Sequence, residues 1–62
     1  MSEIEEIKKL MEDAEWDIKA DDLEEAQKKL EKAKNIAKKI RNEELLNQIL
    51  ALKKKTYRAV SF

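Results

Sequence analysis

The residues of this chain that could take part in chemistry are carboxylates, lysines and a single Trp. Adjacent carboxylates occur at Glu5 and Glu6 and at Glu24 and Glu25, and such pairs can divide general-acid and general-base roles where burial separates them. The chain contains no His and no Cys, so it lacks the usual neutral-pH base, the common nucleophile pairs and sulfur ligands. Both carboxylate pairs fall on the polar face of a predicted helix, where nothing desolvates them. We therefore expect no enzyme activity, and no catalytic, cofactor-binding or metal-binding residue.

A basic tract that includes an aromatic residue lies near the C-terminus: Lys53, Lys54, Lys55, Thr56, Tyr57 and Arg58. Clustered cations with an aromatic ring can hold phosphates or an acidic partner and stack a base. Cations are also typical of a helix C-terminus, where they complement the macrodipole. Fourteen Lys and Arg balance fourteen Asp and Glu, so no long-range field attracts nucleic acid or an anionic membrane. We favour the helix-terminal interpretation and expect neither partner. The alternative is a nucleic-acid or membrane accessory protein that binds through this tract.

Trp16 is the residue that the helical pattern leaves unexplained. On a helix it projects about 170° from the apolar stripe, on the same flank as Lys9 and Ala20. A lone Trp on a charged flank is typical of an interface hot spot. The other interpretation is a partly exposed ring that lies across the alkyl chains of Lys9 and Lys19. We expect Trp16 and Ala20 to contact a protein, an amphipathic peptide or a second copy of the chain.

The elements that carry these residues should all be helices, because the chain has no Gly and no Pro for strand turns. Apolar residues recur at steps of three and four, and Ser2, Asp22 and Asn42 are suited to cap three helices. We predict helices over about 3–20, 23–41 and 43–59. The short connections imply an all-α, antiparallel three-helix bundle that forms one domain over residues 1–62. The stripes are Ile4, Ile7, Leu10, Met11, Ala14 and Ile18, then Leu23, Ala26, Leu30, Ala33, Ala37 and Ile40.

The third predicted helix has a wider apolar arc than one neighbouring helix needs. The arc covers roughly 160° and contains Leu45, Leu46, Ile49, Leu50, Leu52 and Tyr57. Such a helix should touch two surfaces. These are either the first and second predicted helices, which form an antiparallel hairpin, or that hairpin and another chain. We predict Leu46, Leu50 and Tyr57 as a second partner-binding surface. Lys53 falls inside the arc and should extend its ammonium to an acidic partner.

Charges of opposite sign should meet at both ends of this bundle. We expect the basic end of the second helix beside Glu3, Glu5, Glu6, Glu43 and Glu44, and we expect Lys53, Lys54, Lys55 and Arg58 near Asp17, Asp21 and Asp22. Exposed pairs contribute only tenths of a kcal/mol each. They therefore select the topology more than they stabilise it.

From Asp22 to Ala33 the sequence reads D-L-E-E-A-x3-L-x2-A, with Ala26, Leu30 and Ala33 at the packing positions. This segment resembles the second helix of a tetratricopeptide repeat, and Ala14 matches a small residue of the first helix, so the resemblance covers about residues 14–40. The D-x-E-E-A-x6-A hairpin, the three-helix length and Tyr57 resemble the microtubule-interacting-and-transport domains. These resemblances imply a module that holds an amphipathic peptide in a groove between helices and has no catalytic activity.

The function we expect is therefore a non-enzymatic helical module for protein–protein interaction or assembly, which binds a partner helix, a peptide or itself. The first residues, MSEIEEIKK, are acidic where a secretory signal is basic and then apolar, and no apolar run reaches a membrane-spanning length. We expect a cytoplasmic location. A further alternative is an engineered helical bundle without a natural function. The bias toward Glu, Lys, Ala, Leu and Ile favours this alternative, whereas the Gly-free turns and the irregular end TYRAVSF oppose it.

Overall fold

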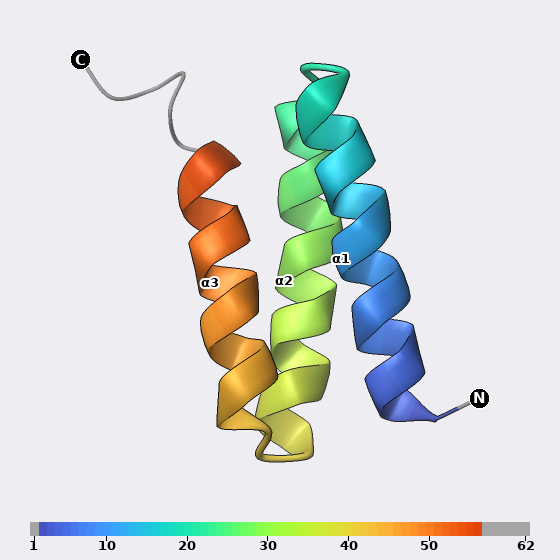
Figure 1. The fold of residues 1–62 in the computed structure, drawn as a ribbon, viewed down its shortest axis with the longest axis vertical. Helices are drawn as coiled ribbons and strands as arrows, with labels where there is room; N and C mark the ends of the chain where they lie inside the picture. Colours follow the sequence, from blue (N-terminus) through green and yellow to red (C-terminus); the bar gives the residue numbers. More distant parts are fainter. Residues whose placement is uncertain (1, 57–62) are drawn as a thin grey trace.

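The computed structural model describes residues 2–56 of the chain. This part consists of three helices, α1 (Glu3–Lys19), α2 (Leu23–Lys39) and α3 (Glu43–Thr56), which run up, down and up (Figure 1). The predicted all-α, antiparallel three-helix bundle is confirmed. The first two helices end one and two residues earlier than predicted. Tyr57, Arg58 and the predicted continuation of the third helix to residue 59 lie outside the described residues.

Each helix begins at the polar residue that the sequence predicts as its cap. The Ser2 hydroxyl accepts a hydrogen bond from the Glu5 N–H at 3.2 Å. A carboxylate oxygen of Asp22 accepts one from the Glu25 N–H at 3.5 Å, and the Asn42 side-chain oxygen accepts one from the Leu45 N–H at 3.0 Å. Each bond satisfies a backbone donor of the first turn that has no partner inside its helix.

Both turns have the same backbone geometry, although neither contains Gly. Asp21 (φ 62°) and Arg41 (φ 55°) adopt the left-handed conformation. The Asp22 N–H donates to the Asp17 carbonyl at 2.7 Å, and the Asn42 N–H donates to the Ala37 carbonyl at 3.0 Å. These are the long hydrogen bonds of a Schellman motif, in which Gly is the usual left-handed residue. The chain thus reverses within a few residues and begins the next helix at once.

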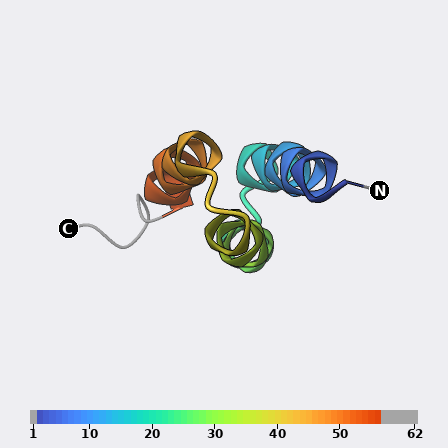
Figure 2. The ribbon, with the colours of Figure 1, turned by 90° about the horizontal axis from the view of Figure 1, so that it is seen from below.

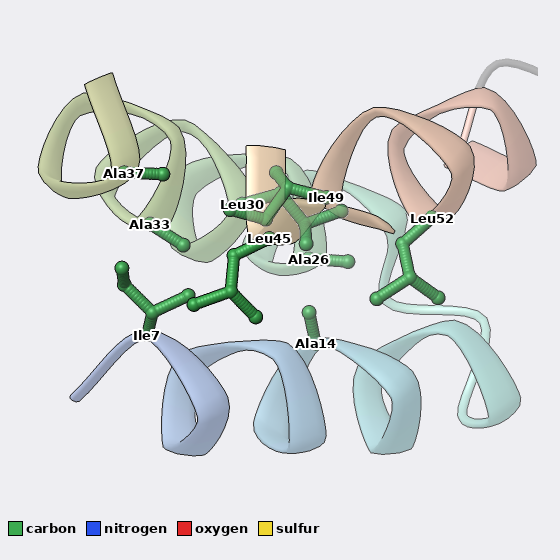
Figure 3. Packing of buried hydrophobic residues seen from close by; sticks show 9 residues of the cluster. All are labelled: Ile7, Ala14, Ala26, Leu30, Ala33, Ala37, Leu45, Ile49 and Leu52. Carbon is green, nitrogen blue, oxygen red and sulfur yellow. The ribbon is translucent and has the colours of Figure 1, made fainter. Parts of the chain in front are cut away.

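The core is narrow because four of its members are alanines. Side chains from all three helices form it (Figure 3). Ala14 of α1 faces α2, whose buried residues include Ala26, Ala33 and Ala37. Small residues at the contact let two helix backbones approach closely. Among residues 2–56 the buried apolar residues are Ile7, Ala14, Ala26, Leu30, Ala33, Ala37, Leu45, Ile49 and Leu52.

The three helices do not contact one another equally. α2 lies between the other two, and α1 and α3 contact each other far less than either contacts α2 (Figure 2). Leu45 and Leu52 of α3 point toward α1 (Figure 3). The broad apolar arc of α3 therefore meets both helices of the hairpin, with α2 as the main neighbour.

Salt bridges between helices follow the predicted charge pattern only in part. Lys39 lies 3.9 Å from Glu3, so the basic end of α2 is beside the start of α1 as expected. Lys53 does reach an acidic partner, but that partner is Glu31 of α2 at 2.7 Å. We expected Lys53 near Asp17, Asp21 and Asp22, and the structure shows its ion pair with Glu31, on the side of α3 that faces α2.

Asp17 forms a salt bridge with Lys29 of α2. The Lys29 ammonium donates to an Asp17 carboxylate oxygen at 2.6 Å, and this hydrogen bond raises the pKa of Lys29 above its usual 10.5.

Candidate functional site

An open groove runs between α1 and α3, and we call it the α1–α3 groove. It consists of three consecutive hollows of about 410, 320 and 100 Å³. The first two share Lys8 and Gln48, and the last two share Glu15, so together they form one continuous feature. The groove exists because α1 and α3 both pack on α2 and only lightly on each other. It extends along most of both helices.

Two apolar rows, each with a seven-residue period, line this groove. On α1 the row is Ile4, Met11 and Ile18, and on α3 it is Leu45 and Leu52. Ile4 is 43 % exposed, and Met11 and Ile18 are half-buried. A seven-residue apolar period keeps a row facing a neighbouring helix, as in coiled coils. Met11 and Ile18 pack against the edge of the core, and the row on α1 is thus covered only in part by α3.

Charged side chains of both signs border the groove. Lys8 and Glu44 border its first hollow, Glu12 and Glu15 its middle, and Lys19 and Lys55 its last part beside Glu15. The groove therefore changes from mixed to acidic to mainly basic along its length. A bound helix would be selected by its charge order as well as by its apolar row.

Sequence reasoning placed the apolar residues of α1 in one stripe and missed the groove. In the structure this stripe divides into two rows. Ile7 and Ala14 are fully buried in the core, whereas Ile4, Met11 and Ile18 line the groove. The seven-residue spacing of the second row was a signal available in the sequence. The sequence could not show that this row lines a groove, because the position of α3 decides whether the row is covered or left partly open.

Trp16 lies on the outer surface of α1, as the sequence predicts. Its side chain is 63 % exposed, and the Lys19 ammonium lies 5.1 Å from the centre of its ring. This cation–π contact agrees with the interpretation in which the ring lies beside a lysine chain. Ala20, the other residue predicted on this flank, is exposed and caps the end of α1. Both residues are thus accessible to a partner.

The second predicted surface lies on another side of the molecule. Leu50 is 40 % exposed, and Leu46 is half-buried at the edge where α3 meets α2. Leu46 lines a hollow of about 250 Å³ together with Ala37, Lys38, Arg41, Asn42 and Glu43, which we call the α2–α3 hollow. The structure therefore does not bring Trp16 together with Leu46 and Leu50. Tyr57, predicted beside these leucines, lies outside the described residues.

The structure separates the lysines of the basic tract. Lys53 pairs with Glu31 of α2, Lys55 borders the α1–α3 groove, and Lys54 is exposed. Consecutive helical residues point about 100° apart, so these lysines serve different surfaces. Arg58, the other predicted phosphate contact, lies outside the described residues.

Glu31 is the most perturbed carboxylate among the described residues. It accepts from Lys53 at 2.7 Å and lies 3.0 Å from the Lys34 ammonium. Hydrogen bonds from Lys53 and then Lys34 lower its pKa from 4.5 to about 2. This ion cluster ties α3 to α2. Each of its two carboxylate oxygens has a lysine of this chain as a partner, so we interpret it as structural.

The remaining acidic residues form no evident chemical site. Glu24 and Glu25 are exposed and lie 3.9 and 3.8 Å from the Lys28 ammonium. Within residues 2–56 no group of three or more acidic side chains is placed to hold a metal ion. No helix in this range combines the length and the apolar character that crossing a membrane would need.

Comparison with known proteins gives no relative from which a function could be transferred. No protein-family profile matches the sequence, and no curated protein or solved structure matches the chain significantly. The resemblance to tetratricopeptide and microtubule-interacting-and-transport modules therefore stays a prediction from the residues.

Proposed function

We propose that this protein is a non-enzymatic interaction module that binds an amphipathic α-helix of a partner protein in the α1–α3 groove. The observation that carries the proposal is the partly exposed row Ile4, Met11 and Ile18 along one open groove, whose α3 side carries the largely buried Leu45 and Leu52. A partner helix placed there would complete a four-helix arrangement and cover Ile4, Met11 and Ile18. Burying such half-exposed apolar surface contributes about 25 cal/mol per Å².

The charges along the groove define the partner further. Its apolar row should repeat at steps of three and four, to match the rows of the groove. Lys or Arg beside this row would face Glu12 and Glu15, and Asp or Glu at one end would meet Lys19 and Lys55. This combination is the chemistry of a mixed-charge amphipathic helix. A cytoplasmic location, proposed from the sequence, is part of the same proposal.

The test is selection from a displayed library of amphipathic helices in which the apolar row is fixed and the flanking charges vary. Binders should carry cations opposite Glu12 and Glu15 and a carboxylate near Lys19 and Lys55. Their affinity for the wild-type protein and for an Ile4→Glu variant is then compared by calorimetry. We expect Ile4→Glu to weaken binding at least about tenfold, because it places a charge in the apolar floor.

Leu50→Glu is the matched control. Leu50 and Ile4 are similarly exposed, at 40 and 43 %, and the substitution is identical, but Leu50 lies away from the groove. This variant should bind the selected helices as the wild type does. Equal losses in the two variants, binders without the expected charge order, or a library that yields no binder would each contradict the proposal.

A further inference from the structure

Trp16 lies outside the α1–α3 groove and is surrounded by a defined charge pattern, of which Glu12 and Lys19 also border that groove. The positions one helical turn away from it are Glu12, Asp13, Lys19 and Ala20. One cation, Lys19, lies near the ring, and the small Ala20 leaves space beside it. The flank thus presents an exposed indole with Glu12 and Asp13 one turn before it, Lys9 a further turn before it, and the Lys19 ammonium after it. α1 as a whole carries seven acidic and three basic residues.

The α2–α3 hollow carries the opposite arrangement. Its apolar floor is formed by Ala37 and Leu46, and its border has the two cations Lys38 and Arg41 and the single acid Glu43. Within residues 2–56 neither of these cations takes part in a salt bridge. The hollow measures about 250 Å³ and is open to solvent. An aromatic side chain of another molecule can therefore reach it from outside.

We propose that the occupant of the α2–α3 hollow is Trp16 of a second copy of this chain. The indole would lie on Leu46, and the carboxylates of Glu12 and Asp13 would meet Lys38 and Arg41. Lys19 would then meet Glu43, the acid of the hollow. A net charge of zero for the whole chain favours such self-recognition, because no overall repulsion opposes it.

The contact joins two different surfaces, so it is heterologous. Each copy would use its Trp16 flank on one neighbour and its α2–α3 hollow on another. Such contacts continue into chains or close into rings and do not stop at a two-fold dimer. Aromatic anchors with charged surroundings are typical of interfaces in which a few residues dominate the affinity.

The experiment is sedimentation analysis of the full chain from micromolar to millimolar concentration. The mean mass of the wild type should rise with concentration and fall on adding salt, because salt screens exposed charge pairs. Trp16→Ala should weaken self-association at least about tenfold. A Lys38→Glu, Arg41→Glu double variant should weaken it similarly, and circular dichroism should show unchanged helix content in both.

Mixing the two weakened variants provides the decisive measurement. Trp16→Ala retains an intact hollow and the double variant retains an intact Trp16, so an equimolar mixture should form a discrete heterodimer. A symmetric contact between two Trp16 rings would predict no recovery on mixing. A wild type that stays monomeric, a Trp16→Ala variant that associates normally, or no heterodimer in the mixture would overturn the proposal. Ile4→Glu should self-associate as the wild type does, so this result is separate from the fate of the α1–α3 groove.

Discussion

Replacing Asp21 by Gly should stabilise this protein, although it removes a side chain. Asp21 has φ 62°, and it precedes the residue whose N–H closes the turn onto Asp17 at 2.7 Å. A left-handed conformation costs a residue with a Cβ atom about 1 to 2 kcal/mol. Gly avoids this cost but loses roughly 0.5 to 1 kcal/mol more backbone entropy on folding. The middle of the two ranges leaves a gain of about 0.7 kcal/mol in the free energy of unfolding, and less for Asp, which tolerates this conformation better than most residues.

Arg41 provides a second measurement of the same effect. It has φ 55° in the other turn, at the opposite end of the bundle (Figure 1). The long Arg side chain is less suited to a left-handed position than Asp. Arg41→Gly should therefore raise the free energy of unfolding at least as much as Asp21→Gly does. The two turns share no contacts, so the gains should add to about 1 to 2 kcal/mol in the double variant. For a domain of this size each kcal/mol raises Tm by about 4 to 8 °C.

Thermal and urea unfolding followed by circular dichroism would measure these changes. Ala20→Gly is the matched control, because Ala20 precedes Asp21 and has φ −84°, where Gly relieves no steric conflict and only adds entropy to the unfolded chain. It should destabilise the protein by roughly 0.5 to 1 kcal/mol. The reasoning is refuted if Asp21→Gly and Ala20→Gly shift the unfolding midpoint in the same direction.

Two further predictions concern the contacts that hold the helices together. The pKa of Glu31 is lowered to about 2, so its salt bridges should stabilise the fold fully above pH 4.5 and lose that effect as the pH falls toward 2. The stability difference between wild type and Glu31→Gln, from urea unfolding, should therefore shrink over this range, and a difference that does not change with pH would contradict it. Leu30 is fully buried, so Leu30→Ala should lower the free energy of unfolding by about 2 to 5 kcal/mol. Circular dichroism at room temperature should then show that much of the chain is unfolded. A cooperative unfolding transition close to that of the wild type would contradict it.

Local features of the sequence were sufficient to predict the helices and their starts. Ser2, Asp22 and Asn42 cap the helices as predicted, because a cap depends on a side chain and the backbone a few residues away. The outward direction of Trp16 was predictable for a similar reason, since helical periodicity alone places it opposite the stripe.

Other features required contacts between residues that are distant in the sequence. Thr56 is 1 % exposed, and its hydroxyl accepts a hydrogen bond from the Gln27 amide at 3.2 Å. Sequence reasoning did not assign Thr56 to the core, because a polar residue near a helix end is usually solvated. The acidic partner expected for Lys53 is Glu31, which the sequence did not identify for a related reason: charge counts give the sign of a neighbour, and only the packing of α3 on α2 selects the residue.

The sequence by itself determined three amphipathic helices, their caps and the outward direction of Trp16, because each depends on spacing along one segment. Only the tertiary structure decided that Ile7 and Ala14 face the core while Ile4, Met11 and Ile18 line an open groove. The physical reason is that α3 packs mainly on α2 and only lightly on α1. Periodicity places residues on a helix face, but the position of the neighbouring helix decides which part of that face is covered.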